Sequence, residues 1–595
     1  MTQTDQPVVD TQSLSTPARV AWLVLIAGTL YICYFHNLGA IGLVGPDEPR
    51  YAWIARDMAE TGDWVTPRLY GKPWFEKPVL YYWGAALSFK LFGVSEAAAR
   101  LPSAISALLA TLALAWLALR LYGAETARWL LLLLPTTVGM VGFSHAAAAD
   151  MPFAGMLTIA MVFAARLLGL LAPSSSTTLS ASFTCFASFA SFASSTSFIS
   201  FCFGLFLGLA VLAKGPAAIV LSGGAVLLWA LFTRRWRDAF RCLHPVAVFS
   251  FCLTTLPWYI LCTRRNPDFF RVFIIEHNFR RYLTPEFQHV QPFWFYAPVL
   301  LVCFLPWLPL LLWTLYDLGK LKSALSRYPV ELFLISWVVF TVIFFSISKS
   351  KLPGYILPAV PALGLLLARQ VARQPKHPYR LGIAFLVFAV LLFAGAELVH
   401  RKPLPHNFEN LPRIMTTLLV AEILLVIVLP NWLMAGTFFS SKKPAYRDMF
   451  CALAILSILI PLVVWPRYLN KYERGFLSAK TLAEGLHRRG VPTERIFTWN
   501  AANRSWRYGA SFYLHAEVMD WDMANRQEAF VITGIATCPQ LKVADYDAKS
   551  LQIYEEGGLW FVCQMTPANS VGGLPGLAGL GGGNHLDDGR DRQPR

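Results

Sequence analysis

The sequence predicts an α-helical protein that crosses a membrane many times, and two observations carry this prediction. Only 14% of the 595 residues are charged and 56% are hydrophobic, whereas about one quarter of the residues of a soluble domain are charged. Apolar runs also recur along the chain, each close to the roughly 20 residues that a helix needs to cross a bilayer. The chain is therefore expected to be a polytopic membrane protein.

The apolar runs and the basic residues between them define a topology. Thirteen segments have the composition of membrane spans: 18–38, 97–120, 125–144, 150–171, 198–213, 216–232, 245–262, 292–316, 329–347, 353–369, 380–398, 411–430 and 447–465. Lys and Arg gather in cytoplasmic loops, and the basic clusters all fall on that side if the N-terminus is inside. These clusters lie at 234–237, 320–322, 369–380 and 442–443. The same count places the loops around Asp47 and Glu276, and the C-terminal region, outside.

The ends and the net charge fit this topology. Residues 1–17 are polar and lack the basic region and small-residue cleavage site of a signal peptide. We expect them to form a cytoplasmic tail before a retained first span. The net charge of +16 is typical of basic cytoplasmic loops. Because no basic stripe with interleaved aromatic residues lies outside the apolar segments, we expect no nucleic-acid partner.

The chain divides into a membrane domain and a hydrophilic region. The membrane domain is expected to span residues 18–465, with external loops at 39–96 and 263–291. A low-complexity insertion rich in Ser, Ala and Phe occupies 173–200.

Beyond the last predicted span the composition changes. Residues 466–565 alternate amphipathic helical patterns with short β-rich runs, which predicts a small α/β domain outside the membrane. Cys538 and Cys563 lie in this region, where they either form a disulfide in an oxidising compartment or remain two separate thiols. The tail 566–595 is rich in Gly and then charged, so we expect it to be disordered.

The first external loop carries a cluster of charges directly after the first apolar segment. Asp47 and Glu48 stand side by side, followed by Arg50. Charges placed where a helix leaves the bilayer are costly unless they are hydrated or used, so the cluster predicts a functional site. Alternatively, the two acidic residues cap a helix that begins at Arg50, because acidic residues favour helix N-termini. The later pair Glu76 and Lys77 favours a functional use.

Further charges stand at the ends of predicted spans. Lys214 is followed by a Gly-Pro pair that breaks the apolar run, and an unpaired charge there would be costly. Asp150 stands at the mouth of the fourth segment, where it serves either a site or an ordinary polar turn. Taken alone, Lys77 would extend to the membrane interface, and His277 would be a loop histidine.

Motifs follow one another over about residues 20–370. They include Asp47-Glu48-x-Arg50-Tyr51-Ala52, Phe75-Glu76-Lys77-Pro78, Ala213-Lys214-Gly215, Glu276-His277-Asn278-Phe279-Arg280-Arg281 and Lys351-Leu352-Pro353-Gly354-Tyr355. In residue types, order and spacing they resemble the lipid A aminoarabinose transferases, which are relatives of the protein O-mannosyltransferases in the GT-C superfamily. The low-complexity insertion departs from the family pattern but falls away from the motifs.

This resemblance implies the GT-C fold and an inverting glycosyltransferase. Its sugar would come from undecaprenyl phosphate at the outer face of the bacterial inner membrane, without a nucleotide cofactor. A departing polyprenyl phosphate gains negative charge, which fixed cations in a water-poor site stabilise. Arg50 and Lys77 suit this role, because Arg binds phosphate in a bidentate manner and Lys acts as a point charge. The resemblance adds Lys214 and Tyr355 to the donor-phosphate site.

Asp47 is expected to be the main catalytic carboxylate, with Asp150 as a second acidic group and Glu48 as a third. If the acceptor is a hydroxyl, Asp47 would be a general base. If the acceptor is a lipid A phosphate, which is already ionised, Asp47 would stabilise the oxocarbenium-like sugar or hold its amine. The sequence leaves both roles open.

The resemblance also implies that Glu76 and His277 bind a divalent metal, namely zinc. A carboxylate oxygen and an imidazole nitrogen are reasonable zinc ligands. Because two protein ligands make a weak site, we expect a structural or lipid-linked metal and not the Lewis acid of the reaction.

The predicted reaction moves 4-amino-4-deoxy-L-arabinose from undecaprenyl phosphate to a lipid A phosphate or a related envelope glycolipid. It would lower the negative surface charge and confer resistance to cationic peptides such as polymyxin. The alternative is a polyprenyl-phosphate-mannose-dependent protein O-mannosyltransferase, but Glu276-His277 and Lys351-Leu352-Pro353-x-Tyr355 favour the aminoarabinose branch. A transporter or flippase fits less well, because the sequence shows no repeat and its charges concentrate in external loops. We expect a monomer.

Overall fold

A computed structural model describes most of the membrane domain and parts of the C-terminal region. The described residues are 16–171, 195–284, 290–320, 328–373, 478–499, 504–521, 529–532, 546–555 and 558–567. The predicted spans at 380–398, 411–430 and 447–465 lie outside these residues, as do Cys538 and most of the insertion at 173–200.

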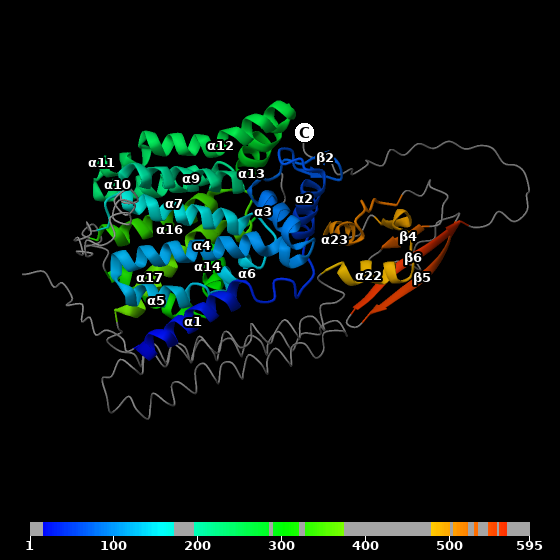
Figure 1. Cartoon of the computed structure of the whole chain (residues 1–595), viewed down its shortest axis with the longest axis horizontal. Helices are drawn as coiled ribbons and strands as arrows, with labels where there is room; N and C mark the ends of the chain where they lie inside the picture. The colour runs from blue at the N-terminus through cyan, green and yellow to red at the C-terminus, as the bar shows by residue number, and fades with distance from the viewer. Residues whose placement is uncertain are drawn as a thin grey trace, which may run out of the picture.

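The membrane part is a bundle of helices that run side by side, horizontally in Figure 1. Each of the first ten predicted segments coincides with one helix or with two consecutive ones. These helices are α1 (Thr16–Tyr34), α4 (Glu96–Tyr122), α5 (Ala124–Leu133), α6 (Val138–Ser144), α7 (Asp150–Leu167), α9 (Thr196–Lys214), α10 (Ala217–Thr233), α12 (Pro245–Arg265), α14 (Tyr296–Cys303), α15 (Leu308–Lys320), α16 (Pro329–Ile347) and α17 (Val360–Ala372). Within the described ranges, six helices are long and apolar enough to cross a membrane, or seven if α5 and α6, bent by 62°, form one broken span. The coarse prediction of a helical membrane fold is confirmed.

Small residues let the central helices approach one another closely. Helix α7 is almost entirely buried and packs between α4 and α9. A Cβ atom on Gly155 of α7 would lie 2.8 Å from the carbonyl oxygen of Ser106 in α4. A Cβ atom on Gly204 of α9 would lie 2.0 Å from the carbonyl oxygen of Ala247 in α12. Such positions bring helix backbones together in membranes, where close packing holds helices in place.

Short elements from the loops cover one end of the bundle. They are α2 (Asp47–Thr61), β1 (Arg68–Leu69), β2 (Lys72–Pro73), α3 (Leu80–Phe92), the π-helix η2 (Arg271–Arg280), α13 (Arg281–Leu283) and the 3₁₀-helix η4 (Pro353–Ala359). This outer layer has its own apolar core, which includes the buried side chains of Tyr51, Phe75, Tyr82 and Phe269. Helix α2 ends at Thr61, and the next residue, Gly62, has a φ of 75°, which favours glycine.

The described part of the C-terminal region contains two helices of more than one turn and a four-stranded sheet. These elements are α22 (Lys480–Arg488), β3 (Ile496–Thr498), α23 (Arg504–Leu514), β4 (Ala529–Ile532), β5 (Tyr546–Glu555) and β6 (Gly558–Pro567). The strand order is β3-β4-β6-β5, with β3 and β4 parallel and the other neighbours antiparallel. Helix α23 packs against α2, so this region lies beside the outer layer (Figure 1).

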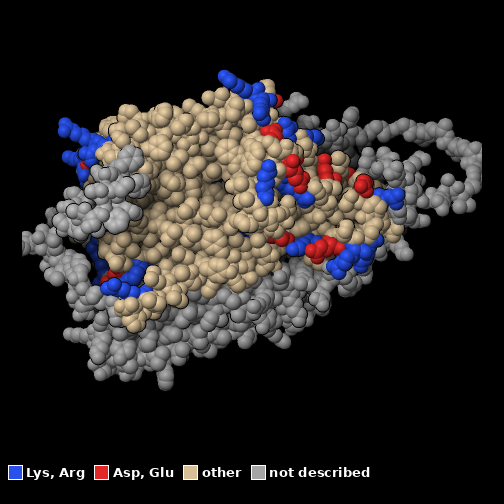
Figure 2. All heavy atoms as spheres, viewed as in Figure 1, with Lys and Arg blue, Asp and Glu red and all other residues tan. Residues whose placement is uncertain are grey.

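Charged side chains gather at the two ends of the bundle, with an uncharged surface between them (Figure 2). At the end away from α2, Arg234, Arg235 and Arg237 follow α10. Between the ends, large apolar side chains such as Leu227 and Leu253 are exposed by 57% and 56%. An exposed apolar surface between two charged ends is expected of a membrane-spanning bundle.

Candidate active site

Asp47 and Glu48 occupy the first turn of α2. The turn before the helix contains Gly45, whose φ of 68° favours glycine, and Pro46 precedes the first helical residue. The helix begins at Asp47 and not at Arg50, and two negative charges in its first turn complement the helix dipole. The two acidic residues do more than cap the helix, because each carboxylate also forms an ion pair with an arginine.

Arg50 links Asp47 to Glu76. Its Nη2 donates to Asp47 Oδ1 at 2.5 Å and lies 2.8 Å from Glu76 Oε2. The guanidinium carbon lies 5.2 Å from the ring centre of Tyr51 and 5.4 Å from that of Trp74, so aromatic faces also stabilise this cation. Half of the Asp47 side chain is exposed, at 51%, whereas the Arg50 side chain is 10% exposed. Asp47 therefore offers a carboxylate at the open edge of a buried charge cluster.

Glu76 stands at the centre of this cluster. Lys77 Nζ lies 3.3 Å and Arg281 Nη1 lies 3.4 Å from Glu76 Oε1, while Arg50 contacts the other oxygen. Burial acts to raise the pKa of Glu76, but the charges of Arg50, Lys77 and Arg281 hold it well below its usual range. The Glu76 carboxylate is ionised and neutralises one of three surrounding cations.

The pKa of Asp47 shifts in the opposite direction. Although half of its side chain is exposed, protein groups packed around the carboxyl partly desolvate it and raise its pKa, and the negative charges of Glu76 and Asp150 add to this shift. Arg50 and Lys77 oppose it but do not outweigh burial. A carboxylate whose pKa is raised is a stronger base than an ordinary aspartate.

Asp150 and Lys214 form an ion pair between two helices of the bundle. Asp150 is the first residue of α7 and Lys214 is the last residue of α9, and Lys214 Nζ donates to Asp150 Oδ1. The same nitrogen lies 4.4 Å from the ring centre of Tyr355 and 5.5 Å from that of Phe153. Lys214 is thus held by a carboxylate and two aromatic rings at the end of its helix.

A cavity of about 400 Å³ lies beside these groups and is lined by some of them. Its charged and polar wall includes Glu76, Lys77, Lys214, His277, Arg281 and Tyr355. Its apolar wall includes Pro216, Ala217, Val220, Leu283, Phe344 and Phe345. The charged side chains that line it carry three positive charges, on Lys77, Lys214 and Arg281, against one negative charge on Glu76. This arrangement suits an anionic group attached to an apolar chain.

The structure brings most of the predicted site residues together. Lys77, Lys214, Tyr355, Glu76 and His277 line the cavity. Arg50 joins them through Glu76, and Asp150 joins them through Lys214. Sequence reasoning gave Arg281 no role, although it lies in the same motif as His277. Its position in that motif was the only signal available.

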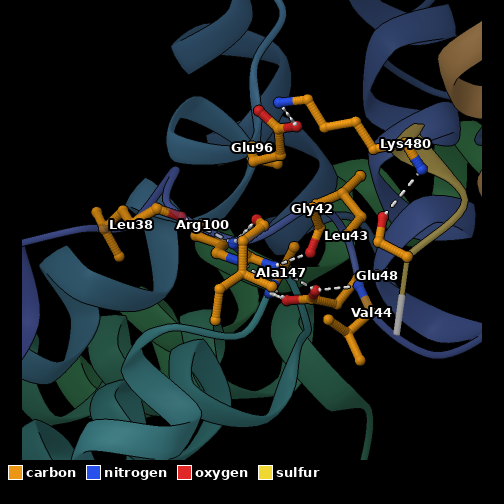
Figure 3. Close-up of polar contacts among 12 residues, drawn as sticks. Leu38, Gly42, Leu43, Val44, Glu48, Glu96, Arg100, Ala147 and Lys480 are labelled. Atoms are coloured by element: carbon orange, nitrogen blue, oxygen red, sulfur yellow. Dashed lines mark hydrogen bonds and ion pairs between the residues drawn. The ribbon is translucent and has the colours of Figure 1, made fainter. Parts of the chain in front are cut away.

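Glu48 differs from the other predicted catalytic groups. Its side chain is 10% exposed, and its carboxylate contacts the Arg100 guanidinium and the backbone N–H groups of Val44 and Ala147 (Figure 3). None of these partners lines the cavity. A catalytic role for Glu48 stays a prediction from sequence, and its contacts point to a different use.

The residues implied as zinc ligands do not fit a metal in this arrangement. Both oxygens of Glu76 contact cations, so a divalent ion would have to displace Arg50, Lys77 or Arg281. Burial lowers the pKa of His277 to about 4, which leaves its ring in the neutral form that binds metals, so the misfit lies at Glu76. Within the described part of the chain, no group of three or more His, Cys, Asp or Glu side chains could hold a metal. We derive no step of the reaction through a metal.

Known proteins are similar to this chain in sequence and in fold. A model of the dolichyl-phosphate-mannose-protein mannosyltransferase family matches residues 20–273. The chain is 34% identical, over 356 residues, to the undecaprenyl phosphate-alpha-4-amino-4-deoxy-L-arabinose arabinosyl transferase of Edwardsiella ictaluri, covering 60% of each chain. It is 33% identical, over 394 residues, to the protein of the same name from Erwinia tasmaniensis, covering 64% of this chain and 66% of that one. The crystal structure of ArnT from Cupriavidus metallidurans bound to undecaprenyl phosphate matches with a TM-score of 0.72 and 23% identity, covering 91% of this chain and 98% of that one.

The chain has the GT-C glycosyltransferase fold. The match to the two sequence relatives spans 60% and 66% of their length, and the structural match at 23% identity concerns the fold. In this GT-C fold, the cavity lies where the outer layer meets the ends of α9, α16 and η4.

Proposed function

We propose that the chain transfers a sugar, with inversion, from undecaprenyl phosphate to an envelope acceptor. The sugar is 4-amino-4-deoxy-L-arabinose and the acceptor is a lipid A phosphate. One observation carries the proposal: a cavity lined by three cations, against one carboxylate, continues into an apolar wall. The names of the sequence relatives and the lipid bound to the solved ArnT structure agree with such a donor.

The cations of the cavity hold the leaving group. During transfer, the bond between the sugar C1 and the phosphate oxygen breaks, and an acceptor oxygen bonds to C1 from the opposite side. The electron pair of the broken bond stays on undecaprenyl phosphate, which gains negative charge. Lys77, Lys214 and Arg281 are already oriented by their contacts with Glu76, Asp150 and Tyr355, so little reorganisation is needed to stabilise that charge.

Asp47 acts on the sugar and not on the lipid phosphate. A lipid A phosphate is already ionised and needs no base, so the half-exposed carboxylate of Asp47 stabilises the positive charge that develops on the sugar. Asp150 neutralises Lys214 and holds it at the cavity. Tyr355 packs its ring against the same amine.

We place the cavity at the periplasmic face of the bacterial inner membrane. Thirteen spans, with the N-terminus in the cytoplasm, put the outer layer and residues 466–565 outside and the basic loops inside. The uncharged surface between the two charged ends supports this arrangement (Figure 2). The enzyme acts as a monomer in this proposal.

Reconstitution tests the reaction and its alternative together. Proteoliposomes that contain the purified chain are given undecaprenyl-phosphate aminoarabinose with lipid A, or polyprenyl-phosphate mannose with a Ser/Thr peptide. Mass spectrometry is expected to detect aminoarabinose on lipid A in the first mixture and no glycopeptide in the second. Glycopeptide without modified lipid A would favour the protein O-mannosyltransferase, and no product in either mixture would reject the proposal.

A further inference from the structure

The buried pair of Glu48 and Arg100 lies next to the proposed active site but outside its cavity. Arg100 Nε donates to Glu48 Oε1 at 3.1 Å, and Arg100 Nη2 donates to Oε2 at 2.7 Å. The backbone N–H of Val44 donates to Oε2 at 2.7 Å, and that of Ala147 donates to Oε1 at 2.6 Å. The carboxylate thus accepts four hydrogen bonds from three separate segments (Figure 3).

Arg100 uses its remaining donors on the segment after α1. Its Nη1 donates to the carbonyl oxygens of Leu38 at 2.8 Å and Ile41 at 2.7 Å, and its Nη2 donates to that of Gly42 at 2.9 Å. With the two bonds to Glu48, all five donors of the guanidinium are in use. A fixed fork of five donors is specific to Arg, because Lys has three donors on a flexible stem.

The three segments tied together carry the two candidate catalytic carboxylates. Asp47 is adjacent to Glu48, and Asp150 stands three residues after Ala147. We propose that Glu48 and Arg100 are positioning residues, whose buried pair fixes Asp47 and Asp150 relative to each other. The inference rests on the proposed function, because it assigns the pair a task in sugar transfer. It also moves Glu48 from catalysis to positioning.

The C-terminal region holds the same segment from its other side. The backbone N–H of Leu43 donates to the Tyr513 hydroxyl at 2.7 Å, and that hydroxyl donates to Glu96 Oε1 at 3.1 Å. Tyr513 lies in α23, whereas Glu96 opens α4, the helix that also carries Arg100. The segment from Leu38 to Val44 is therefore fixed to α4 both directly and through the C-terminal region.

Two further contacts join the C-terminal region to α4 and to the segment from Leu38 to Val44. Lys480 Nζ lies 2.8 Å from Glu96 Oε1 (Figure 3). A Cβ atom on Gly42 would lie 2.2 Å from Ser478 Oγ, so the close approach of the C-terminal region requires glycine there. The C-terminal region thus contributes to the position of Asp47 through Tyr513, although none of its described residues lines the cavity.

The test uses Arg100→Lys and Glu48→Gln in the full chain, reconstituted in nanodiscs. Both variants are expected to bind undecaprenyl phosphate as the wild type does and to keep the KM for the donor. Their kcat is expected to fall about 100-fold, the loss that a displacement on the order of 1 Å at a reacting centre brings. Hydrogen exchange, which does not depend on activity, is expected to rise in residues 38–44 and 145–149 but not in η2.

Arg369→Lys is the matched control. Arg369 forms a buried ion pair with Glu331 in α16, near the end of α17 away from η4 and the cavity. This variant is expected to lower thermal stability while kcat stays at the wild-type value. An equal loss of kcat in the control, or a wild-type kcat in Arg100→Lys, would overturn the positioning role.

A milder variant covers the case in which Arg100→Lys does not fold. Tyr513→Phe removes one hydroxyl and is expected to lower kcat less than Arg100→Lys, with faster exchange at Leu43. Unchanged kcat and exchange in Tyr513→Phe would reject the contribution of the C-terminal region. A wild-type protein that neither binds undecaprenyl phosphate nor transfers sugar would refute the proposed function. Hydrogen exchange would still show whether the pair of Glu48 and Arg100 holds residues 38–44 and 145–149 in place.

Discussion

Glu48 and Glu76 are both buried carboxylates of the outer layer, but their surroundings differ in charge balance. Glu48 faces one guanidinium and two backbone N–H groups. Glu76 faces three cations, two of which also line the cavity. A balanced pair has no capacity left for a ligand, whereas excess cations beside a cavity attract an anion. Both carboxylates are buried, so the number of cations around each one, and not its burial, distinguishes the positioning role of Glu48 from the ligand-binding surroundings of Glu76.

The largest expected effect lies beside the balanced pair, at Asp47. Asp47→Asn keeps the shape of the side chain but removes its charge. Transfer is expected to fall by about 10²- to 10³-fold, the range for loss of one group that stabilises charge in the transition state, while undecaprenyl phosphate still binds. Asp57→Asn in the same helix is the control and is expected to retain full transfer. Full transfer by Asp47→Asn would end its catalytic assignment.

The excess of cations is tested directly by Lys77→Ala. Loss of one charge-assisted contact removes about 1.5–3 kcal/mol, so the affinity for undecaprenyl phosphate is expected to fall roughly 10- to 100-fold. Binding is measured by titration in detergent. Lys72→Ala removes an exposed lysine of the same loop and is expected to bind normally. Equal affinities for both variants and the wild type would show that the cavity cations do not hold the phosphate.

Glu76→Gln sharpens the comparison by removing the only carboxylate that lines the cavity within the described residues. Arg50, Lys77 and Arg281 would each lose their contact with the Glu76 charge, so the melting temperature of the free protein is expected to fall. Undecaprenyl phosphate supplies the missing negative charge and is expected to raise the melting temperature of the variant more than that of the wild type. If the lipid stabilises both proteins equally, the cations and the phosphate are not coupled.

The pH dependence follows from the raised pKa of Asp47. Because folding favours the protonated carboxyl, the ionised form is lost on acidification at a higher pH than for an ordinary aspartate. Transfer is therefore expected to fall as the pH drops through this raised value, and kcat/KM is measured against pH in proteoliposomes. Since ionisation of Asp47 costs stability in the folded state, Asp47→Asn is expected to melt at a higher temperature than the wild type at neutral pH. A lower melting temperature would contradict the direction of the shift.

The smallest expected effect is that of metal removal. Glu76 already contacts three cations, so dialysis against EDTA is expected to leave kcat and lipid affinity unchanged. Transfer is compared before and after dialysis, and after addition of zinc. Loss of activity that zinc restores would show that Glu76 and His277 hold a metal after the cations rearrange.

The sequence predicted the helical bundle well because membrane spans depend on local composition. Each of the first ten apolar segments coincides with one helix or with two consecutive ones, since a bilayer selects for runs of about 20 apolar residues. The predicted cations and carboxylates also converge, because the motifs flank the ends of spans that meet at the outer layer. The sequence raised a helix at Arg50 only as the alternative to a functional site and did not predict α3, since the stability of both helices in the loop at 39–96 comes from packing in the outer layer.

The role of Arg100 was not predicted, although a signal was present. Arg100 stands within the predicted span at 97–120, and a charge inside an apolar segment indicates a buried partner. The sequence does not name that partner, because Glu48 lies 52 residues earlier in the chain. Tyr513 is more distant still, at 470 residues from Leu43, and no local pattern connects them.

The sequence by itself determined that the chain has the composition of a helical membrane protein and that its motifs resemble those of sugar transferases that use lipid phosphates. These properties reside in composition and in short runs of residues. Only the tertiary structure decided that Glu76 is surrounded by three cations and that Glu48 is matched by Arg100. Charge balance depends on which side chains meet in space, and contacts between distant segments are set by packing.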